Sequence, residues 1–282
     1  MGVVDVRQAD GLVTPPALGA PRVRWDRNLL VRLAAVVAFF ALWGILAVAN
    51  QVAHWFPAVL FPPPWDILRR GAAMTASGEL QAHILISLDR VLKGFAIGAV
   101  SAVAIGMLVG RSQLAQNFLE SILEMLRPIP PLAFLPLMVI WLGIGEMSKV
   151  IFIAYTSFFP VFTTTVEGIK YVDPLLIRAA QSLGAKERDI FRYVVLPAAL
   201  PNVIVGLRLG FAISFFVIVA AEFIAADTGL GYLINDARTF FLVDRMLLGA
   251  VVIGFLGFFF NWILKRVERL LLPWRKETRE SA

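Results

Sequence analysis

The stretch that decides the fold is IRAAQSLGAKERDIFRYVVLPAALP, residues Ile177–Pro201. Just before it, Asp173–Pro174 predicts a helix start, with an acidic N-cap followed by proline in the first turn. Gly184 is expected to end this helix. A second helix is expected to begin at the charged residues 186–189 and to end near Leu196–Pro197. The stretch therefore predicts a polar helix–break–helix element, set between apolar segments.

The remainder of the chain is too apolar for a soluble domain. Of its 282 residues, 59% are hydrophobic and 16% are charged, and the mean hydropathy is +0.78. The lipid bilayer is therefore the expected solvent. There is no cysteine, which excludes disulfides and thiolate metal sites. His54 and His83 lie far apart, and only Glu79 stands at a helical spacing from His83, so no metal site is expected.

Apolar length sets the fold class. A helix needs about 20 apolar residues to cross the hydrocarbon core, and it satisfies its own backbone polar groups. The sequence predicts an all-α membrane protein with six transmembrane helices, over residues 29–272, between tails at 1–28 and 273–282. The expected spans are Leu29–Ala49, Leu92–Gly110, Pro128–Ile144, Val150–Val166, Val203–Ala225 and Met246–Leu264.

Basic residues set the expected orientation. Lys and Arg gather in both tails, between the second and third spans, and between the fourth and fifth spans. The positive-inside rule then predicts that both termini and the 177–201 element are cytoplasmic. The net charge of +6 is interpreted as topology rather than as a nucleic-acid surface, because no basic patch interleaved with aromatics lies outside the spans. The polar, proline-containing start is not expected to be a signal peptide.

The second span carries small residues at every fourth position. They are Gly94, Gly98, Ala102, Gly106 and Gly110. A four-residue step keeps them on one side of a helix, where another backbone can approach closely. The pattern predicts helix packing, and it leaves open whether the neighbour belongs to the same subunit or to another.

Several residues within the spans are candidates for a translocation pathway. Pro136 predicts a kink that either lines a pathway or is purely structural. Glu222 is an acid near the outer end of the fifth span, and functional, interfacial and structural hydrogen-bonding roles all remain open. Arg208 is expected to reach a carbonyl or the headgroups. Pro131, Phe159 and Glu222 are the expected pathway residues.

Two outer segments and one loop also carry recognisable sequence patterns. In VLFPPPWDILRR after the first span, Pro62–Pro64 favour an extended chain. The whole segment is too polar and broken to span, and it is expected to form a periplasmic cover or docking surface. Gly229 and Gly231 are expected to separate the fifth span from a second short helix. The stretch Gly143–Lys149 faintly resembles a phosphate loop but lacks the Gly-Lys-Ser/Thr ending, so a helix-capping turn is expected. No Walker motif occurs, so any use of ATP requires a separate subunit.

The spacing within the opening stretch resembles the EAA loop of ABC importer permeases. That motif reads E-A-A, three residues, G, nine residues, I, one residue, L-P. Here Arg178 stands for the glutamate, Gly184 keeps its place, and Val194 stands for the isoleucine before Leu196–Pro197. The resemblance implies an EAA loop over about residues 167–200 and a coupling helix at about Pro174–Lys186. The implied coupling residues are Arg178, Ala179, Ala180, Gln181, Ser182, Leu183, Gly184, Ala185 and Lys186.

The resemblance extends from about Leu60 to Trp274. SLDRVLKGFAIGAVSAVAIGMLVG, LRPIPPLAFLPLMVIWLGIGEMSK and AAEFIAADTGLGYLI resemble the nitrate/sulfonate/taurine/bicarbonate branch of these permeases. This implies the type I ABC importer permease fold in the bacterial inner membrane. The implied partners are a second copy of the chain, two cytoplasmic ATPase subunits that hold ATP and Mg, and a periplasmic binding protein. Aromatic acids or vitamin precursors remain alternative substrates.

Two other classes of membrane protein fit the sequence less well. A self-contained secondary transporter often shows internal repeats and midplane ionisable groups, and no repeat is visible here. A membrane enzyme would need polar catalytic groups gathered at one interface, and none assemble from the sequence. The expectation is a non-catalytic transport subunit with no cofactor of its own.

Overall fold

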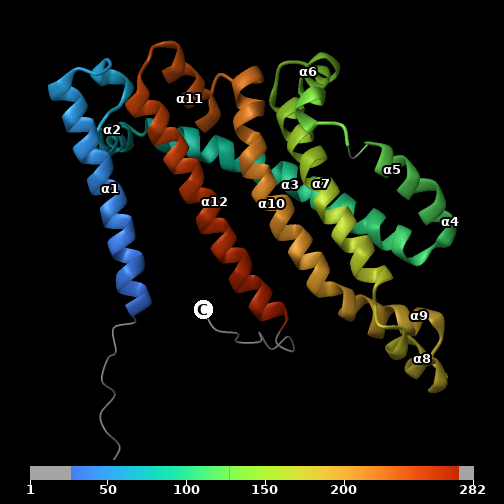
Figure 1. Cartoon of the computed structure of the whole chain (residues 1–282). Helices are drawn as coiled ribbons and strands as arrows, with labels where there is room; N and C mark the ends of the chain where they lie inside the picture. The colour runs from blue at the N-terminus through green and yellow to red at the C-terminus, as the bar shows by residue number, and fades with distance from the viewer. Residues whose placement is uncertain (1–26, 127, 273–282) are drawn as a thin grey trace, which may run out of the picture. The chain divides into compact units, whose positions relative to one another are not determined.

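The computed structural model describes residues 27–126 and 128–272, and every regular element in these ranges is helical (Figure 1). Residue contacts divide the chain into two units, one ending at Leu46 and the other beginning at Ala47. The boundary falls within α1 (Arg27–Ala53). Its segment Leu30–Ala53 is long and apolar enough to cross a membrane, as the first expected span requires.

The second unit holds the other helices. They are α2 (Pro64–Ala76), α3 (Glu79–Arg111), α4 (Gln113–Ala115), α5 (Ser121–Leu126), α6 (Pro131–Leu142), α7 (Glu146–Lys170), α8 (Pro174–Ser182), α9 (Glu187–Ile190), α10 (Leu196–Ala225), α11 (Leu230–Thr239) and α12 (Val243–Leu271). A 3-10 turn, η1 (Ala58–Leu60), precedes α2. Two π-helical segments, η2 (Gln116–Glu120) and η3 (Phe191–Val195), follow α4 and α9.

Helices α3 and α7 run parallel and pack through the glycine face. A Cβ built on Gly94 would lie 2.6 Å from the Cβ of Ile153, and one on Gly110 would lie 2.8 Å from the Cβ of Ile169. A Cβ on Gly98 would overlap the carbonyl of Ala154. The predicted packing role is therefore confirmed. The neighbour that the sequence left open is α7 of the same chain.

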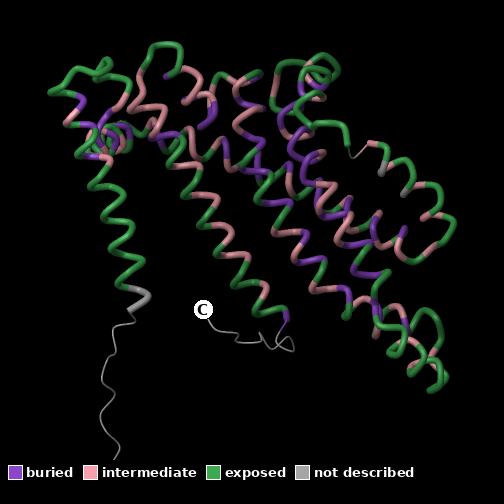
Figure 2. The backbone as a smooth tube through the Cα atoms, viewed as in Figure 1, coloured by how far each residue is buried: buried purple, intermediate pink, exposed green. Residues whose placement is uncertain are grey.

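Helix α10 packs antiparallel on α7. A Cβ on Gly168 would lie 2.8 Å from the Cβ of Asn202, and one on Gly210 would lie 3.0 Å from the carbonyl oxygen of Ser157. The central apolar cluster joins α3, α6, α7 and α10, and it includes Val91, Leu135, Met138, Phe152, Ile153, Phe211, Phe215 and Ile218. Buried residues accordingly follow these helices (Figure 2).

The third apolar segment is shorter than predicted. Five helices in the described residues are long and apolar enough to cross a membrane, and α6 is a shorter apolar helix. The expected span Pro128–Ile144 is cut at both ends. Pro131 occupies the first turn of α6, and Gly143 stops it with a φ of +82°. At 1.5 Å per residue, α6 is about 18 Å long, less than the hydrocarbon thickness of about 30 Å.

The helix expected to end near Leu196–Pro197 instead continues into the membrane. Residues Glu187–Ala225 form one 39-residue helical run. The π segment Phe191–Val195 comes just before Pro197, which has no N–H and would clash with the carbonyl of an ordinary preceding turn. A local π bulge is one way a helix accommodates such a residue. The fifth span therefore begins well before Val203, inside the predicted element.

The two segments at the other end of α10 fold as short helices. Pro63 is extended as expected, whereas Pro64 already begins α2, because proline suits the first turn of a helix. Gly229, with a φ of +122°, precedes α11, which confirms the predicted break and second short helix. In Figure 1, α11 lies at one end of α10, and α8 and α9 lie at the opposite end.

Candidate functional site

The α8–α9 elbow, residues 173–190, is built by three local signals. Asp173 caps α8, because its Oδ1 accepts the N–H of Leu175 at 2.8 Å. Pro174 fills the first turn, where its missing N–H has no cost. Gly184 turns the chain with a φ of +78°, a left-handed conformation that favours glycine. The predicted helix–break–helix is confirmed up to the start of α9.

One face of the elbow is anchored to the bundle. Ile177, Ala180 and Ala185 pack against a buried cluster made by the ends of α7 and α10 and the residues near them. Its members are Ile169, Val172, Ile190, Val195 and Ala199. The elbow is therefore packed against the ends of these two helices.

The other face of the elbow is open. Leu175 is 69% exposed and Leu183 is 88% exposed. Among the predicted coupling residues, Ala180 and Ala185 are half-buried, and the others are exposed. They are Arg178, Ala179, Gln181, Ser182, Leu183, Gly184 and Lys186. Large apolar side chains left in water next to polar ones are typical of a protein interaction site.

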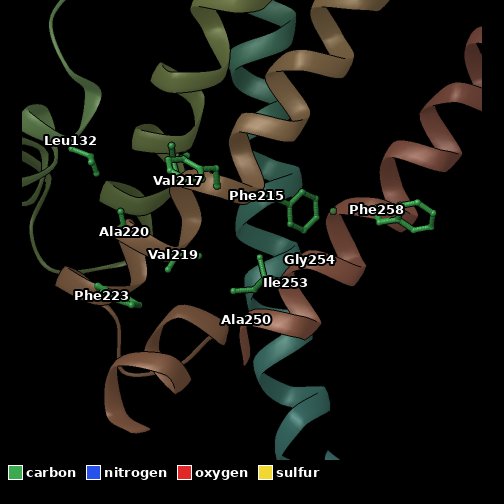
Figure 3. Close-up of a pocket in the computed structure, with 12 residues that line it drawn as sticks. Leu132, Phe215, Val217, Val219, Ala220, Phe223, Ala250, Ile253, Gly254 and Phe258 are labelled. Atoms are coloured by element: carbon green, nitrogen blue, oxygen red, sulfur yellow. The ribbon is translucent and has the colours of Figure 1, made fainter. Parts of the chain in front are cut away.

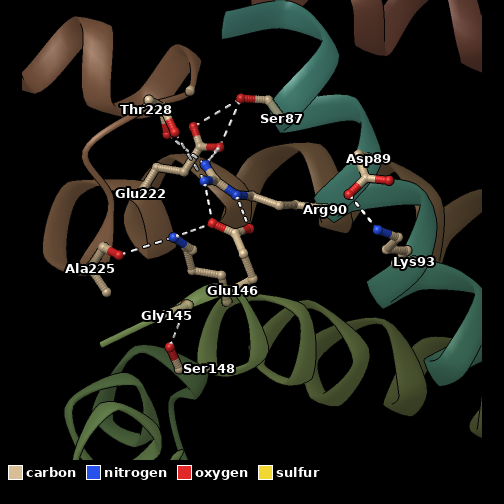
Figure 4. A network of polar contacts seen from close by, with 12 residues as sticks. Ser87, Asp89, Arg90, Lys93, Gly145, Glu146, Ser148, Glu222, Ala225 and Thr228 are labelled. Atoms are coloured by element: carbon tan, nitrogen blue, oxygen red, sulfur yellow. Dashed lines mark hydrogen bonds and ion pairs between the residues drawn. The ribbon is translucent and has the colours of Figure 1, made fainter. Parts of the chain in front are cut away.

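The opposite end of α10 holds a charge cluster, Arg90–Glu146–Lys149–Glu222 (Figure 4), in which Glu146 is exposed and the other three residues are buried. Glu222 is completely buried, and Arg90 is 1% exposed. The Arg90 Nη1 donates to Glu222 Oε1 at 2.7 Å. Ser87 Oγ donates to the same carboxylate at 2.8 Å, and the N–H of Gly231 donates at 2.7 Å. Glu222 therefore has partners on α3 and α11.

The other side of Arg90 binds a second carboxylate. Its Nε and Nη2 donate to the two oxygens of Glu146 at 2.6 and 2.7 Å, a bidentate geometry. Lys149 Nζ lies 3.0 Å from Glu146 and donates to the carbonyl of Ala225 at 3.1 Å. Two cations and two carboxylates thus join α3, α7 and α10, so buried charge is paired rather than isolated.

Sequence reasoning missed this cluster. Arg90 fell just outside the expected span Leu92–Gly110, and Glu146 and Lys149 fell in the expected capping turn Gly143–Lys149. For Glu222 the sequence left three roles open, and structural hydrogen bonding is the one observed. The available signal was Glu222, the one acid of the largely apolar helix α10, because a carboxylate inside an apolar span requires a partner.

The three expected pathway residues occupy different settings. Pro131 is exposed at the start of α6. Phe159 lines an apolar groove of about 300 Å³ together with Tyr155 and Phe158. Glu222 belongs to the charge cluster. The pathway role of each stays a prediction.

A second groove was not predicted. It has a volume of about 560 Å³ and lies between α10 and α12 beside the start of α6 (Figure 3). Phe215, Ile253 and Phe258 are among its side chains, and its lining is almost wholly apolar. Such a groove suits acyl chains or apolar side chains.

Two further polar residues also find partners. Arg208 pairs with Glu268 of α12 at 3.2 Å, which corrects the expectation of a carbonyl or headgroup partner. His83 Nδ1 accepts the N–H of Gly229 at 3.0 Å. Within residues 27–126 and 128–272, no group of three or more His, Cys, Asp or Glu side chains could hold a metal ion.

Comparison with known proteins places the chain among transport components. Residues 96–273 match the family model described as "Binding-protein-dependent transport system inner membrane component". The taurine transport system permease protein TauC of Escherichia coli (strain K12) is 34% identical over 92% of this chain and 96% of its own length. The putative aliphatic sulfonates transport permease protein SsuC of Bacillus subtilis (strain 168) is 36% identical over 91% and 90%.

More distant matches agree with these. The nitrate import permease protein NrtB of Synechocystis is 32% identical over 69% of this chain and 70% of its own length. Among solved structures, an inward-facing form of the MetNI methionine ABC transporter has a TM-score of 0.61 at 18% identity. It covers 68% of this chain and 95% of the matched chain. At that identity the match shows a shared fold.

Proposed function

The chain belongs to the family of binding-protein-dependent transport system inner membrane components, and from that membership we propose that it is the membrane subunit of an ATP-driven importer of a small anion. Sulfonates, taurine, nitrate and bicarbonate are the solutes of this class. The names of the relatives support it, because taurine, aliphatic sulfonates and nitrate are small oxyanions or carry one.

The proposed assembly has four further subunits. A second copy of the chain completes the passage, two ATPase subunits hold ATP and Mg, and a binding protein delivers the solute, which with this chain makes a full importer. Lys and Arg in the tails and around the elbow support cytoplasmic termini and a cytoplasmic elbow. Helices α2 and α11 then face the periplasm. The protein itself is a multi-pass membrane protein.

The elbow carries the mechanism. It is anchored to α7 and α10, and its other face is open to a partner. When the ATPases close on ATP, the docked elbow moves with them and tilts the helical run Glu187–Ala225. The charge cluster at the far end keeps α3, α7 and α10 together, so the tilt is passed on as a rigid-body motion rather than lost in local bending. The groove at Phe159 and the start of α6 at Pro131 are the proposed pathway surfaces.

The test replaces Gly184 with Asp. An Asp at a φ of +78° is strained, and its added bulk and charge alter the docking turn. Anion uptake is expected to fall at least about tenfold, while the amount of inserted permease is unchanged. The matched control is Gly143→Asp, since Gly143 has a φ of +82° and, like Gly184, nothing within 4 Å of an added Cβ. Normal uptake by Gly184→Asp with normal ATPase assembly would contradict the proposal.

A further inference from the structure

We propose that the ATPase subunit that receives α8 places an Asp or Glu carboxylate against Arg178. This inference rests on the proposed function, because it requires α8 to dock on an ATPase, and it adds the chemistry of the docking groove. The outward face of α8 is formed by residues three, four and seven positions apart, which are Leu175, Arg178, Ala179 and Ser182. All four are exposed.

Arg178 is the unpaired charge of that face. Within the described part of the chain, no carboxylate lies within ion-pair distance of its guanidinium. Asp173 is the acid at the start of α8, and its Oδ1 already accepts the N–H of Leu175. The hydrogen bond from Ser182 Oγ goes to the backbone carbonyl of Arg178 at 3.0 Å and does not engage the guanidinium.

The apolar surroundings determine what must meet this charge. A groove that covers Leu175 and Leu183 also removes water from Arg178, which lies on the same exposed side of the elbow. A desolvated guanidinium without a partner is strongly unfavourable. A carboxylate matches its planar fork with two parallel hydrogen bonds and restores neutrality. An acidic residue in the groove is therefore the complement that this face requires.

Membrane headgroups fit the elbow less well than a protein does. Anionic lipids select faces on which basic residues cluster without acids. Here Lys186 and Arg188 alternate with Glu187 and Asp189, and all four are exposed. This mixture of charges favours a protein surface over a lipid surface. The acid of that protein surface then lies opposite Arg178.

The first measurement identifies what contacts α8. The chain contains no cysteine, so a Leu175→Cys variant carries a single benzophenone-maleimide probe in the complete transporter in native membranes. Irradiation is expected to join the probe to the ATPase. A probe that joins only to lipid overturns both this inference and the proposed function.

The second measurement identifies the acid. In the Arg178→Lys variant, a water-soluble carbodiimide condenses the new ammonium group with any carboxylate in contact. The amide bond forms, and the carbodiimide takes up the lost water and leaves as its urea. Mass spectrometry is expected to find residue 178 joined to an Asp or Glu of the ATPase. A Leu175 probe that joins to the ATPase without any such amide overturns the acid alone and leaves the proposed function standing.

Function supplies an independent check. Arg178→Glu is expected to weaken ATPase retention and uptake by about tenfold or more, because like charges then face each other in the groove. Arg178→Lys keeps the charge and is expected to retain most of both. Changing the cross-linked acid of the ATPase to Lys restores retention of the Arg178→Glu permease. Full uptake by Arg178→Glu, at equal amounts in the membrane, overturns the inference.

Discussion

Charged residues have opposite environments at the two ends of α10. At the α11 end, Arg90 and Glu222 are withdrawn from solvent and bonded to each other, and they join three helices. At the α8 end, Arg178 and the leucines around it are exposed, and only the inner face of the elbow is packed. A buried network whose hydrogen bonds are all made holds helices in one arrangement, whereas an exposed apolar face is typical of an interaction site. The difference separates an end whose charges are satisfied within the chain from an end whose outer face is open.

The largest expected effect comes from breaking the charge cluster. Arg90→Met leaves Glu222 buried without its cation, a change that typically costs about 3–5 kcal/mol. The apparent melting temperature of the purified permease in mild detergent should fall sharply, and the yield in membranes should fall with it. The double variant Arg90→Met/Glu222→Met should recover part of the loss, because it removes both charges and leaves neither of them buried without a partner.

A control on the same helix makes this test specific. Lys93 pairs with Asp89 at 2.7 Å, but both side chains are exposed. Lys93→Met should change stability by less than about 0.5 kcal/mol, as exposed helix pairs do. Equal melting temperatures for the Arg90 and Lys93 variants would show that the cluster does not hold the helices together.

The next effect tests the close approach of α3 and α7. Gly98→Leu places a side chain where even a Cβ would overlap the Ala154 carbonyl and the Ser157 hydroxyl. Overpacking of this kind costs about 1–3 kcal/mol or more, so we expect a clear drop in the melting temperature. Gly254→Leu on α12 is the matched control, because nothing lies within 4 Å of an added Cβ there. A drop as large for Gly254→Leu would remove helix contact as the cause.

Sequence patterns predicted the local features of both ends. The glycine face at Gly94–Gly110 and the break at Gly184 depend on spacing and on backbone conformation, which neighbouring residues reveal. The helix that packs on the glycine face could not be predicted from the sequence. More than 30 residues separate α3 and α7, and many helices could accept such a face. The coupling role of the elbow stays a prediction.

The charge cluster escaped prediction for a different reason. Arg90 is 56 residues from Glu146 and 132 from Glu222, and each residue alone is compatible with a membrane interface. Only the packing of three helices makes them meet. The length of α6 and the π segment before Pro197 were missed because hydropathy reports apolar composition rather than where a helix starts or bends.

A smaller and local effect is expected at the elbow. Asp173→Ala removes the side-chain acceptor of the Leu175 N–H and typically costs about 1 kcal/mol of helix stability. Because α8 is exposed, we expect faster amide exchange within α8 and little change in the melting temperature of the whole permease. Asp173→Asn keeps an acceptor oxygen and should exchange like the parent. A melting-temperature loss equal to that of Arg90→Met would mean that the elbow is part of the rigid unit.

Apart from the Lys93→Met control, the smallest effect is expected at a charge pair of intermediate exposure. Arg208 on α10 and Glu268 on α12 are 3.2 Å apart, and their side chains are 32% and 20% exposed. Water and salt still reach such a pair, so Arg208→Gln should cost no more than about 1 kcal/mol, and less at high ionic strength. Melting curves at low and high salt measure both quantities. If burial decides what a charge pair contributes, the effect must lie between those of Lys93→Met and Arg90→Met, and a salt-independent loss as large as that of Arg90→Met would separate stability from burial in this protein.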